Sequence, residues 1–185
     1  YYQVHGIEIL SHQKNPFIKG LMRVADLIAN ILVEHDIHHV FMITGGAAMH
    51  LNDALGNHPD LEYICCHHEQ AVAMSTEAYA RVKETLGVSV VTTGPGGTNA
   101  ITGVAGSWID SVPHLILSGQ VFLSQTIGDS GLRQLGVQEL NIIDLVKPVT
   151  KYAVMVKKPE ETLYHIQKAI HMATTGRPGP VWIDI

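Results

Sequence analysis

Short apolar runs and amphipathic stretches alternate along most of the chain. Runs rich in β-branched and aliphatic residues predict strands, and they lie at residues 39–43, 61–66, 87–92, 114–118, 152–156 and 181–185. Between them, apolar residues recur at helical spacing, which predicts helices at about residues 19–36, 47–55, 69–82, 99–109, 138–146 and 163–175. Segment 121–136 is polar and glycine-bearing without a clear period, so we expect a loop over one edge of the sheet.

This alternation of strand, short loop and helix is typical of a doubly wound α/β fold. We predict a mostly parallel sheet of about six strands with helices on both faces. A chain of 185 residues suits one domain of ordinary size, which we assign to residues 19–185. Residues 1–18 show neither an amphipathic period nor a signal-peptide pattern, and we interpret them as a leader or an expression remnant. Because the chain stops within a predicted core strand, we expect a fragment of a longer polypeptide.

An acidic residue, Glu69, stands where the apolar run 61–66 gives way to a helix. In open α/β sheets the carboxyl ends of the strands form the edge at which ligands bind, so this position favours a functional carboxylate. The simpler explanation is an acidic residue that complements the helix dipole, an effect of at most ~1 kcal/mol. Along this helix, residues that recur at helical spacing predict the apolar face: Ala71, Met74, Ala78 and Val82.

Three predicted strands end in unusual loops, which a parallel sheet would bring to one edge. Their sequences are TGG at 44–46, HHE at 67–69 and TTGPGGTN at 92–99. Glycines let a flat ligand approach the backbone, and amides at helix starts bind anions. The 92–99 loop lacks the lysine of a phosphate-binding P-loop, and neither glycine loop has the spacing of a dinucleotide-binding motif. We therefore predict a ligand site at this edge without assigning a nucleotide to it.

Composition narrows the choice of partners. The net charge of −5 argues against nucleic acid or an anionic membrane surface, and no apolar run reaches the ~18 residues of a membrane span. Cys65 and Cys66 are interpreted as core residues of a strand in a reducing compartment, which favours a cytoplasmic protein. With His67 and His68 they invite a zinc site, but consecutive strand residues face opposite sides of the sheet. We therefore predict no metal site in this chain.

Four segments together resemble the N-terminal pyrimidine-binding domain of thiamine-diphosphate enzymes, in particular the large subunit of acetolactate synthase. They are VFMITGGAAMHLNDAL, HHEQAVAMSTEAYAR, GVSVVTTGPGGTNAITGVAGSWIDSVPHLILSGQV and RQLGVQELNIIDLVKPVTKYA. Their order and spacing are highly specific, and the resemblance covers residues 19–185. It implies an enzyme that decarboxylates a 2-keto acid such as pyruvate and transfers the acyl carbanion to a second 2-keto acid.

The resemblance also implies roles for particular residues. Glu69 would hydrogen-bond a ring nitrogen of the cofactor's aminopyrimidine, which requires a carboxyl group that shares or donates a proton in a dry pocket. Gln120 would hydrogen-bond reacting oxygens, and it forms the catalytic pair with Glu69. The cofactor-binding set would comprise Thr44, Gly45, Gly46, Glu69, Pro95 and Asn99. The expected cofactors are thiamine diphosphate and Mg²⁺, and the sequence leaves open whether FAD is bound.

A missing domain and two sequence differences limit what the resemblance implies. The diphosphate and Mg²⁺ are held in that family by a separate domain with a Gly-Asp-Gly to Asn-Asn motif, which this chain lacks, so the isolated chain is expected to be inactive. The family further implies a homodimer or homotetramer formed through the pyrimidine-binding domain. Acetolactate synthases usually carry Tyr-Pro where this chain has Ile43-Thr44, and a phenylalanine where it has Val137. Two alternatives stay open: another thiamine-diphosphate lyase or decarboxylase, acting on a 2-keto acid, oxalyl-CoA or a diketone, and a non-catalytic regulatory paralogue.

Overall fold

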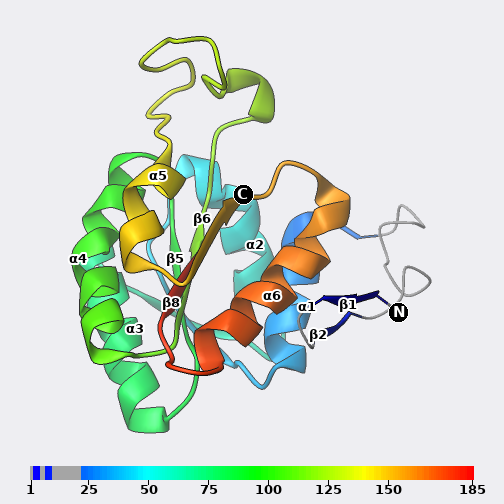
Figure 1. Ribbon diagram of the computed structural model, residues 1–185, viewed down its shortest axis with the longest axis vertical. Helices are drawn as coiled ribbons and strands as arrows, with labels where there is room; N and C mark the ends of the chain where they lie inside the picture. Colours follow the sequence, from blue (N-terminus) through cyan, green and yellow to red (C-terminus); the bar gives the residue numbers. More distant parts are fainter. Residues whose placement is uncertain (1, 5–6, 10–21) are drawn as a thin grey trace.

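The structure, a computed structural model, describes residues 2–4, 7–9 and 22–185. Its centre is a six-stranded sheet in which all neighbouring strands are parallel (Figure 1). In spatial order the strands are β4 (Glu62–Cys65), β3 (His39–Met42), β5 (Gly87–Val91), β6 (His114–Ser118), β8 (Pro180–Asp184) and β7 (Tyr152–Met155). The predicted doubly wound α/β fold is confirmed, and this sheet is parallel throughout.

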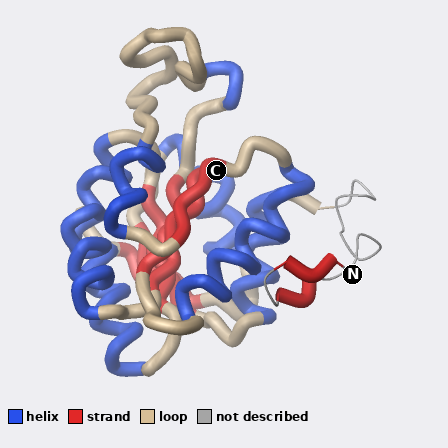
Figure 2. Tube along the Cα trace, in the orientation of Figure 1, coloured by secondary structure: helices blue, strands red, loops and turns tan. Residues whose placement is uncertain are grey.

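Helices cover both faces of the sheet (Figure 2). One layer holds α1 (Val24–Glu34), α2 (Met49–Asn57) and α6 (Thr162–Thr174), and the other holds α3 (Glu69–Lys83), α4 (Pro95–Asp110) and α5 (Ile142–Val146). Consecutive strand residues face opposite layers, so Leu115 and Leu117 of β6 belong to the first core and Ile116 to the second. Central strands buried on both faces give continuous apolar runs, which explains why the sequence predicts them well.

Short elements complete the described structure. The 3₁₀ helices are η3 (Gly46–Ala48), η4 (Leu123–Gln125), η5 (Lys147–Val149) and η6 (Pro159–Glu161). Near the N-terminus, β1 (Tyr2–Val4) pairs antiparallel with β2 (Ile7–Ile9). Apart from these two strands, the expected leader at residues 1–18 lies outside the described residues. No helix within the described ranges is both long and apolar enough to cross a membrane.

The strand order creates a switch point between β3 and β5. From β3 the chain passes through α2 to β4 on one side, whereas from β5 it passes through α4 to β6 on the other side. In open α/β sheets, the crevice at the carboxyl ends of such strands is the usual ligand site. Because every strand of the sheet is parallel, the loops that follow β3, β4, β5, β6 and β7 and the end of β8 all lie at this edge.

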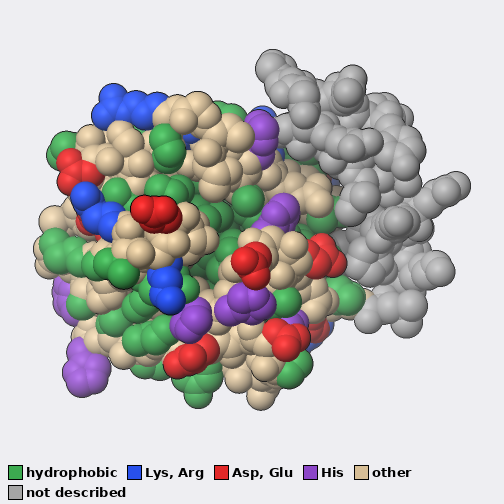
Figure 3. Space-filling view, turned by 90° about the horizontal axis from the view of Figure 1, so that it is seen from below, with side chains coloured by type: hydrophobic (Ala, Val, Ile, Leu, Met, Phe, Trp, Pro, Cys, Tyr) green, Lys and Arg blue, Asp and Glu red, His purple; other side chains and the backbone are tan. Residues whose placement is uncertain are grey.

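The opposite edge of the sheet, where the strands begin, looks different. In the space-filling view from that side, acidic, basic and histidine side chains are interspersed among apolar ones (Figure 3). The 121–136 segment, in contrast, projects beyond the carboxyl edge (Figure 1). This placement agrees with the expected loop at the sheet edge, although the segment also contains η4.

The interpretation of Cys65 and Cys66 as core residues is wrong. Within the described residues, β4 is an edge strand that pairs with β3 alone, and its residues are largely exposed. Cys65 is exposed and Cys66 is partly exposed. An apolar run of this length is compatible with a central strand, but an edge strand leaves one side of its backbone and part of its side chains open. The compartment inferred from buried cysteines therefore loses its support.

The predicted apolar face of α3 is also wrong. Its four predicted members, Ala71, Met74, Ala78 and Val82, are all exposed. The buried face consists of Val72, Ala73, Thr76 and Ala80. The reason is close packing of α3 against α4: a Cβ added at Gly103 of α4 would lie 2.6 Å from the Ala73 Cβ. Such close contact selects small side chains, which a search for large apolar residues does not register.

Two helix starts differ from their predictions. The helix expected from residue 138 begins only at Ile142, because Gln138 has a left-handed backbone conformation with φ of 58°. The first helix begins at Val24, whereas its predicted start at residues 19–21 lies outside the described part of the chain. The remaining boundaries agree with the predictions to within a few residues.

Candidate functional site

The loops after β3 and β5 touch directly at the switch point. A Cβ added at Gly45 would lie 2.4 Å from the Thr92 Cβ, and a Cβ added at Gly96 would lie 2.6 Å from Thr92 Cγ2. The Thr92 side chain therefore occupies the space between the two glycines. Real Cβ atoms do not approach this closely, so glycine at position 45 lets the 44–46 loop meet Thr92, and glycine at position 96 lets the 92–97 loop close over the Thr92 side chain.

Glu69 is the first residue of α3, directly after its N-cap. The N-cap is His68, whose Nδ1 accepts a hydrogen bond from the Gln70 N–H at 3.1 Å. The partly exposed Glu69 carboxylate stands at the positive end of the helix dipole. Its Oε2 accepts a hydrogen bond from Asn99 Nδ2 of α4 at 2.9 Å. No donor among residues 22–185 engages Oε1, and this oxygen lies 3.4 Å from the place of a Cβ on Gly96. Glu69 is thus fixed by one oxygen and open at the other.

Gly94 sets the turn that leads into α4. Its φ of 60° is left-handed, a conformation that glycine adopts without steric cost. A Cβ there would also lie 2.1 Å from the carbonyl oxygen of Gln138. The next residue, Pro95, is the first residue of α4, where its missing N–H is no loss. The backbone of the 92–97 loop therefore packs directly on the backbone at residue 138.

Gln120 follows β6 and is buried, with all hydrogen-bonding positions of its amide engaged. Its Oε1 accepts from Thr93 Oγ1 at 2.7 Å and from the Val121 N–H at 2.9 Å. Its Nε2 donates to the Leu140 carbonyl at 3.1 Å and to Asp184 Oδ2 at 3.0 Å. A backbone N–H can only donate and a carbonyl can only accept, so these partners fix which end of the amide is nitrogen. In this arrangement Gln120 has no free position for a reacting oxygen.

Asp184, at the end of β8, is the buried carboxylate of this edge. Its side chain is fully buried, and Oδ1 accepts a hydrogen bond from Ser118 Oγ of β6 at 2.6 Å. Ser118 Oγ in turn accepts from Trp182 Nε1 at 2.7 Å. Burial raises the pKa of Asp184 to about 6, and the hydrogen bonds from Ser118 and Gln120 oppose this rise.

A cavity of about 400 Å³ opens beside these loops. Its lining includes Gly45, Gly46, Thr92, Thr93, Gln120, Phe122, Val137 and Gln138. Thr44, Glu69, Pro95 and Asn99 are not part of this lining. The predicted residues therefore form two groups, one around Glu69 and Asn99 and one along the cavity. Thr92 connects them, because it lines the cavity and also contacts the position of Gly96 beside Glu69. Thr44 and Pro95 are exposed next to these groups.

Sequence reasoning missed three contributors to this edge. Thr92 and Thr93 stand inside the quoted glycine loop, and their position directly after a strand was the available signal. Asp184 is the single charged residue in the apolar run 181–185, which was a second signal. The contact of Asp184 with Gln120 could not be inferred, because the two residues meet only through the pairing of β6 with β8.

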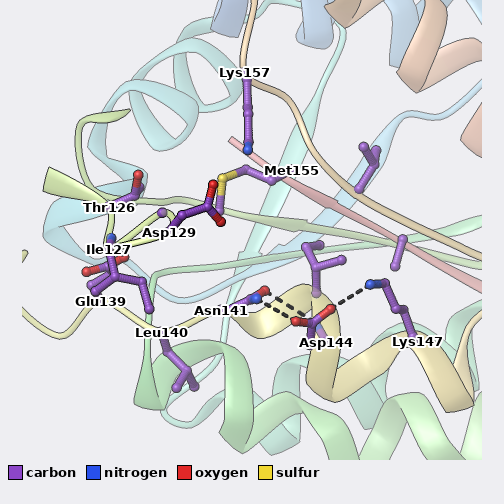
Figure 4. Close-up of a pocket in the computed structure, with 14 residues that line it drawn as sticks. Thr126, Ile127, Asp129, Glu139, Leu140, Asn141, Asp144, Lys147, Met155 and Lys157 are labelled. Atoms are coloured by element: carbon purple, nitrogen blue, oxygen red, sulfur yellow. Dashed lines mark hydrogen bonds and ion pairs between the residues drawn. The ribbon is translucent and has the colours of Figure 1, made fainter. Parts of the chain in front are cut away.

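A second cavity, of about 420 Å³, lies between residues 126–129, α5 and β7 (Figure 4). On α5, Asp144 accepts a hydrogen bond from Asn141 Nδ2 at 2.7 Å and pairs with Lys147 Nζ at 2.5 Å. These polar groups therefore satisfy one another at the rim. None of the predicted site residues lines this cavity.

Glu139 anchors the segment between the two cavities. Its carboxylate accepts hydrogen bonds from the backbone N–H groups of Ile127, Leu135 and Gly136. Desolvation raises the pKa of Glu139, but the three backbone hydrogen bonds outweigh it and lower the pKa overall. This anchor fixes the chain next to Gln138, whose carbonyl packs on Gly94.

In sequence, the chain is similar to one family of known proteins. The family described as "Thiamine pyrophosphate enzyme, N-terminal TPP binding domain" matches residues 22–145. The acetolactate synthase large subunit of Buchnera aphidicola subsp. Schizaphis graminum is 40% identical over 161 residues, covering 87% of this chain and 27% of that protein. The probable acetolactate synthase large subunit of Methanocaldococcus jannaschii is 40% identical over 164 residues, covering 89% and 27%. The mitochondrial acetolactate synthase of Schizosaccharomyces pombe is 37% identical over 160 residues, covering 86% and 23%. The chain spans about a quarter of the length of these relatives.

Proposed function

Because this chain belongs to the thiamine pyrophosphate enzymes and matches their N-terminal TPP binding domain, we propose that it binds the aminopyrimidine ring of thiamine diphosphate, the same cofactor under its other name. The observation that carries this proposal is the Glu69 carboxylate. One oxygen is held by Asn99, and the other faces Gly96 without a donor from residues 22–185. A carboxylate fixed in this way can share a proton with a ring nitrogen.

The residues around Glu69 suit a flat, nitrogen-bearing ring. Glycines at positions 45, 46 and 96 leave the backbone uncovered by side chains, so a planar group can approach it closely. A Cβ at Gly46 would meet no atom within 4 Å, which leaves space on that side of the loop. Thr44, Pro95 and Asn99 border the same loops and complete the proposed cofactor-binding set.

Glu69 would hold the decisive proton in this site. When bound, thiamine diphosphate supplies the nucleophilic carbon that attacks a 2-keto acid. Glu69 would keep a proton at Oε1, between the carboxylate and the ring nitrogen, while Asn99 keeps the carboxylate from rotating. A preorganised group of this kind costs no reorganisation during the reaction.

For the reaction, we infer acetolactate-synthase-like chemistry: decarboxylation of pyruvate and transfer of the acyl carbanion to a second 2-keto acid. The support is 36–40% identity to acetolactate synthases over most of the chain. One observation favours a second candidate, a related decarboxylase or lyase with another acceptor. Val137 lines the cavity beside Gln120, where the resemblance to acetolactate synthases implies the larger phenylalanine, and we infer that the smaller side chain changes the shape of the acceptor pocket. Mg²⁺ and the diphosphate would be held by a part of the enzyme outside these 185 residues.

The test uses the complete protein and two matched variants. Calorimetric titration with thiamine diphosphate and Mg²⁺ is expected to show binding, and pyruvate is expected to give acetolactate. Glu69→Gln should lower turnover by about a hundredfold or more, the range seen for loss of a proton-transfer group. Glu84→Gln, at the other end of α3, is the control and should keep turnover. Absence of cofactor binding would support a regulatory paralogue instead, and acetaldehyde as sole product would support a simple decarboxylase.

A further inference from the structure

The buried chain of hydrogen bonds at the carboxyl edge joins β6 and β8 to the loops that follow β5 and β6. It runs from Trp182 through Ser118 to the Asp184 carboxylate, and from there through the Gln120 amide to Thr93. Trp182, Ser118 and Asp184 are almost completely buried, and Gln120 and Thr93 are nearly so. Thr93 directly precedes Gly94, so this chain ends at the glycine loop that carries Gly96.

The Asp184 carboxylate receives its two hydrogen bonds from neutral groups. Ser118 of β6 and Gln120 face the carboxylate, and the register partner on β7 is Met155. Desolvation is the main influence on its pKa, and no charged side chain contributes. A buried carboxylate without a countercharge is costly. The hydrogen-bond donors around it are its only compensation among the described residues.

The Gln120 amide needs this acceptor. Its Nε2 carries two hydrogens, one of which is taken by the Leu140 carbonyl at 3.1 Å and the other by Asp184 Oδ2 at 3.0 Å. Removing Asp184 would leave a buried N–H without a partner, which costs more than a hydrogen bond gains. The amide would then turn or shift, and Thr93 would lose its acceptor.

We propose that Asp184 is a positioning residue that orients the Gln120 amide and thereby holds the 92–97 loop in the shape that places Gly96 beside Glu69. The contacts stand without any assumption about activity, whereas the importance of this loop for catalysis rests on the proposed function. Gln120 then acts mainly as a strut between β6, β8 and the glycine loop. This role explains why its amide has no free position for substrate.

Three variants of the complete protein separate this role from packing. Asp184→Val fills a similar volume with a residue that suits a buried strand but offers no acceptor. Asp184→Asn can turn its amide oxygen toward Gln120 Nε2 and its nitrogen toward Ser118 Oγ, which has a lone pair left after the bond from Trp182. Ser118→Ala removes the other hydrogen bond to Asp184 and leaves the contact with Gln120 intact.

Amide hydrogen exchange, measured without cofactor, reports directly on the stability of the 92–97 loop. For peptides covering residues 92–97 and 119–121, Asp184→Val should speed exchange about tenfold or more, as expected for loss of a hydrogen bond to a charged group. Asp184→Asn and Ser118→Ala should stay near the wild-type rate. Wild-type exchange in Asp184→Val, or equal acceleration in all three variants, would overturn the proposal.

A second readout distinguishes this proposal from the proposed function. In the active enzyme, kcat should fall at least tenfold in Asp184→Val and be restored in Asp184→Asn. An unchanged kcat in Asp184→Val would overturn the link between this loop and catalysis. If the wild-type protein neither binds thiamine diphosphate nor converts 2-keto acids, the proposed function fails, and hydrogen exchange still decides the role of Asp184.

Discussion

Two carboxylates, Glu69 and Asp184, lie at the same edge of the sheet but differ in burial and hydrogen bonding. Glu69 is partly exposed at a helix N-terminus and has one oxygen without a donor among residues 22–185. Asp184 is buried and has a hydrogen-bond donor on each oxygen. A group that binds a ligand must leave one position open, whereas a group that supports the site must be satisfied internally. The hydrogen bonds thus favour a ligand-binding role for Glu69 and a supporting role for Asp184.

Asp184 also makes a testable contribution to pH-dependent stability. Its folded-state pKa of about 6 lies above the unfolded value of 3.8. Because the folded state holds the proton of Asp184 more tightly than the unfolded state, protonation stabilises the fold. This stabilisation is complete below the unfolded-state pKa and is lost as the pH rises through the folded-state pKa of about 6. Asp184→Asn does not titrate. Between pH 7 and pH 5, the unfolding free energy of the wild type should therefore rise by about 1 kcal/mol relative to that of the variant.

Urea unfolding of both chains at the two pH values measures this difference. Other titrating groups, including Glu139, are common to both proteins and cancel in the comparison. A gap between wild type and Asp184→Asn that stays constant, or that moves in favour of the variant as the pH falls, would contradict the raised pKa.

At the scale of elements, the contact of α3 with α4 depends on the absence of a side chain at Gly103. A Cβ there would lie 2.6 Å from the Ala73 Cβ and 3.0 Å from the α3 backbone. Alanine normally favours a helix interior by ~1 kcal/mol over glycine. At this contact, overpacking of 1–3 kcal/mol works against that gain. Because α3 carries Glu69 and α4 carries Asn99, any separation of the helices also displaces the site.

Gly103→Ala should therefore lower the unfolding free energy by about 1 kcal/mol. Gly56→Ala in α2 is the matched control, because its Cβ would lie 3.8 Å from the nearest atom, at ordinary contact distance. That control should be neutral or stabilise the chain by up to ~1 kcal/mol. Thermal unfolding of both variants measures these changes. An equal gain in unfolding free energy in both would show that α3 and α4 move apart without cost.

Elements differ in how far the sequence predicts them. Central strands such as β6 are predicted to the residue, because burial on both faces gives a continuous apolar run. The edge strand β4 gives a similar run, although its side chains are largely exposed. The face of α3 is mispredicted, because close packing selects Ala73 and Thr76 over the larger Met74 and Val82. Periodicity records where large apolar residues stand, and close helix contacts need small ones.

The site is predictable only as far as it follows from local sequence. The loops at 44–46, 67–69 and 92–99 follow strands, and a parallel sheet brings them to one edge. The contact of Glu69 with Asn99 depends on the distance between α3 and α4, which the sequence pattern does not contain. The contact of Gln120 with Asp184 depends on β8 lying beside β6, with β7 outside it. Strand order is a property of the whole sheet and has no short-range signal.

At the scale of the whole molecule, the exposed apolar residues of α3 are a candidate contact surface. Ala71, Met74, Ala78 and Val82 form an apolar stripe on the surface. Met74 is 45% and Val82 is 82% exposed, and no described residue covers them. Exposed apolar stripes of this kind commonly mark protein contacts. We propose that a second copy of the protein packs on this stripe, in agreement with the homodimer that the resemblance implies.

A charge placed in the middle of the stripe tests this assembly. In the complete protein, Met74→Asp should weaken dimerisation by about a hundredfold or more, because an unpaired charge in an apolar interface costs several kcal/mol. Leu145→Asp is the matched control: Leu145 is 48% exposed on α5, away from the stripe, and its substitution should leave the dimer intact. Sedimentation equilibrium over a range of concentrations measures both. A dimer of unchanged strength in Met74→Asp would exclude this face of α3 from the interface.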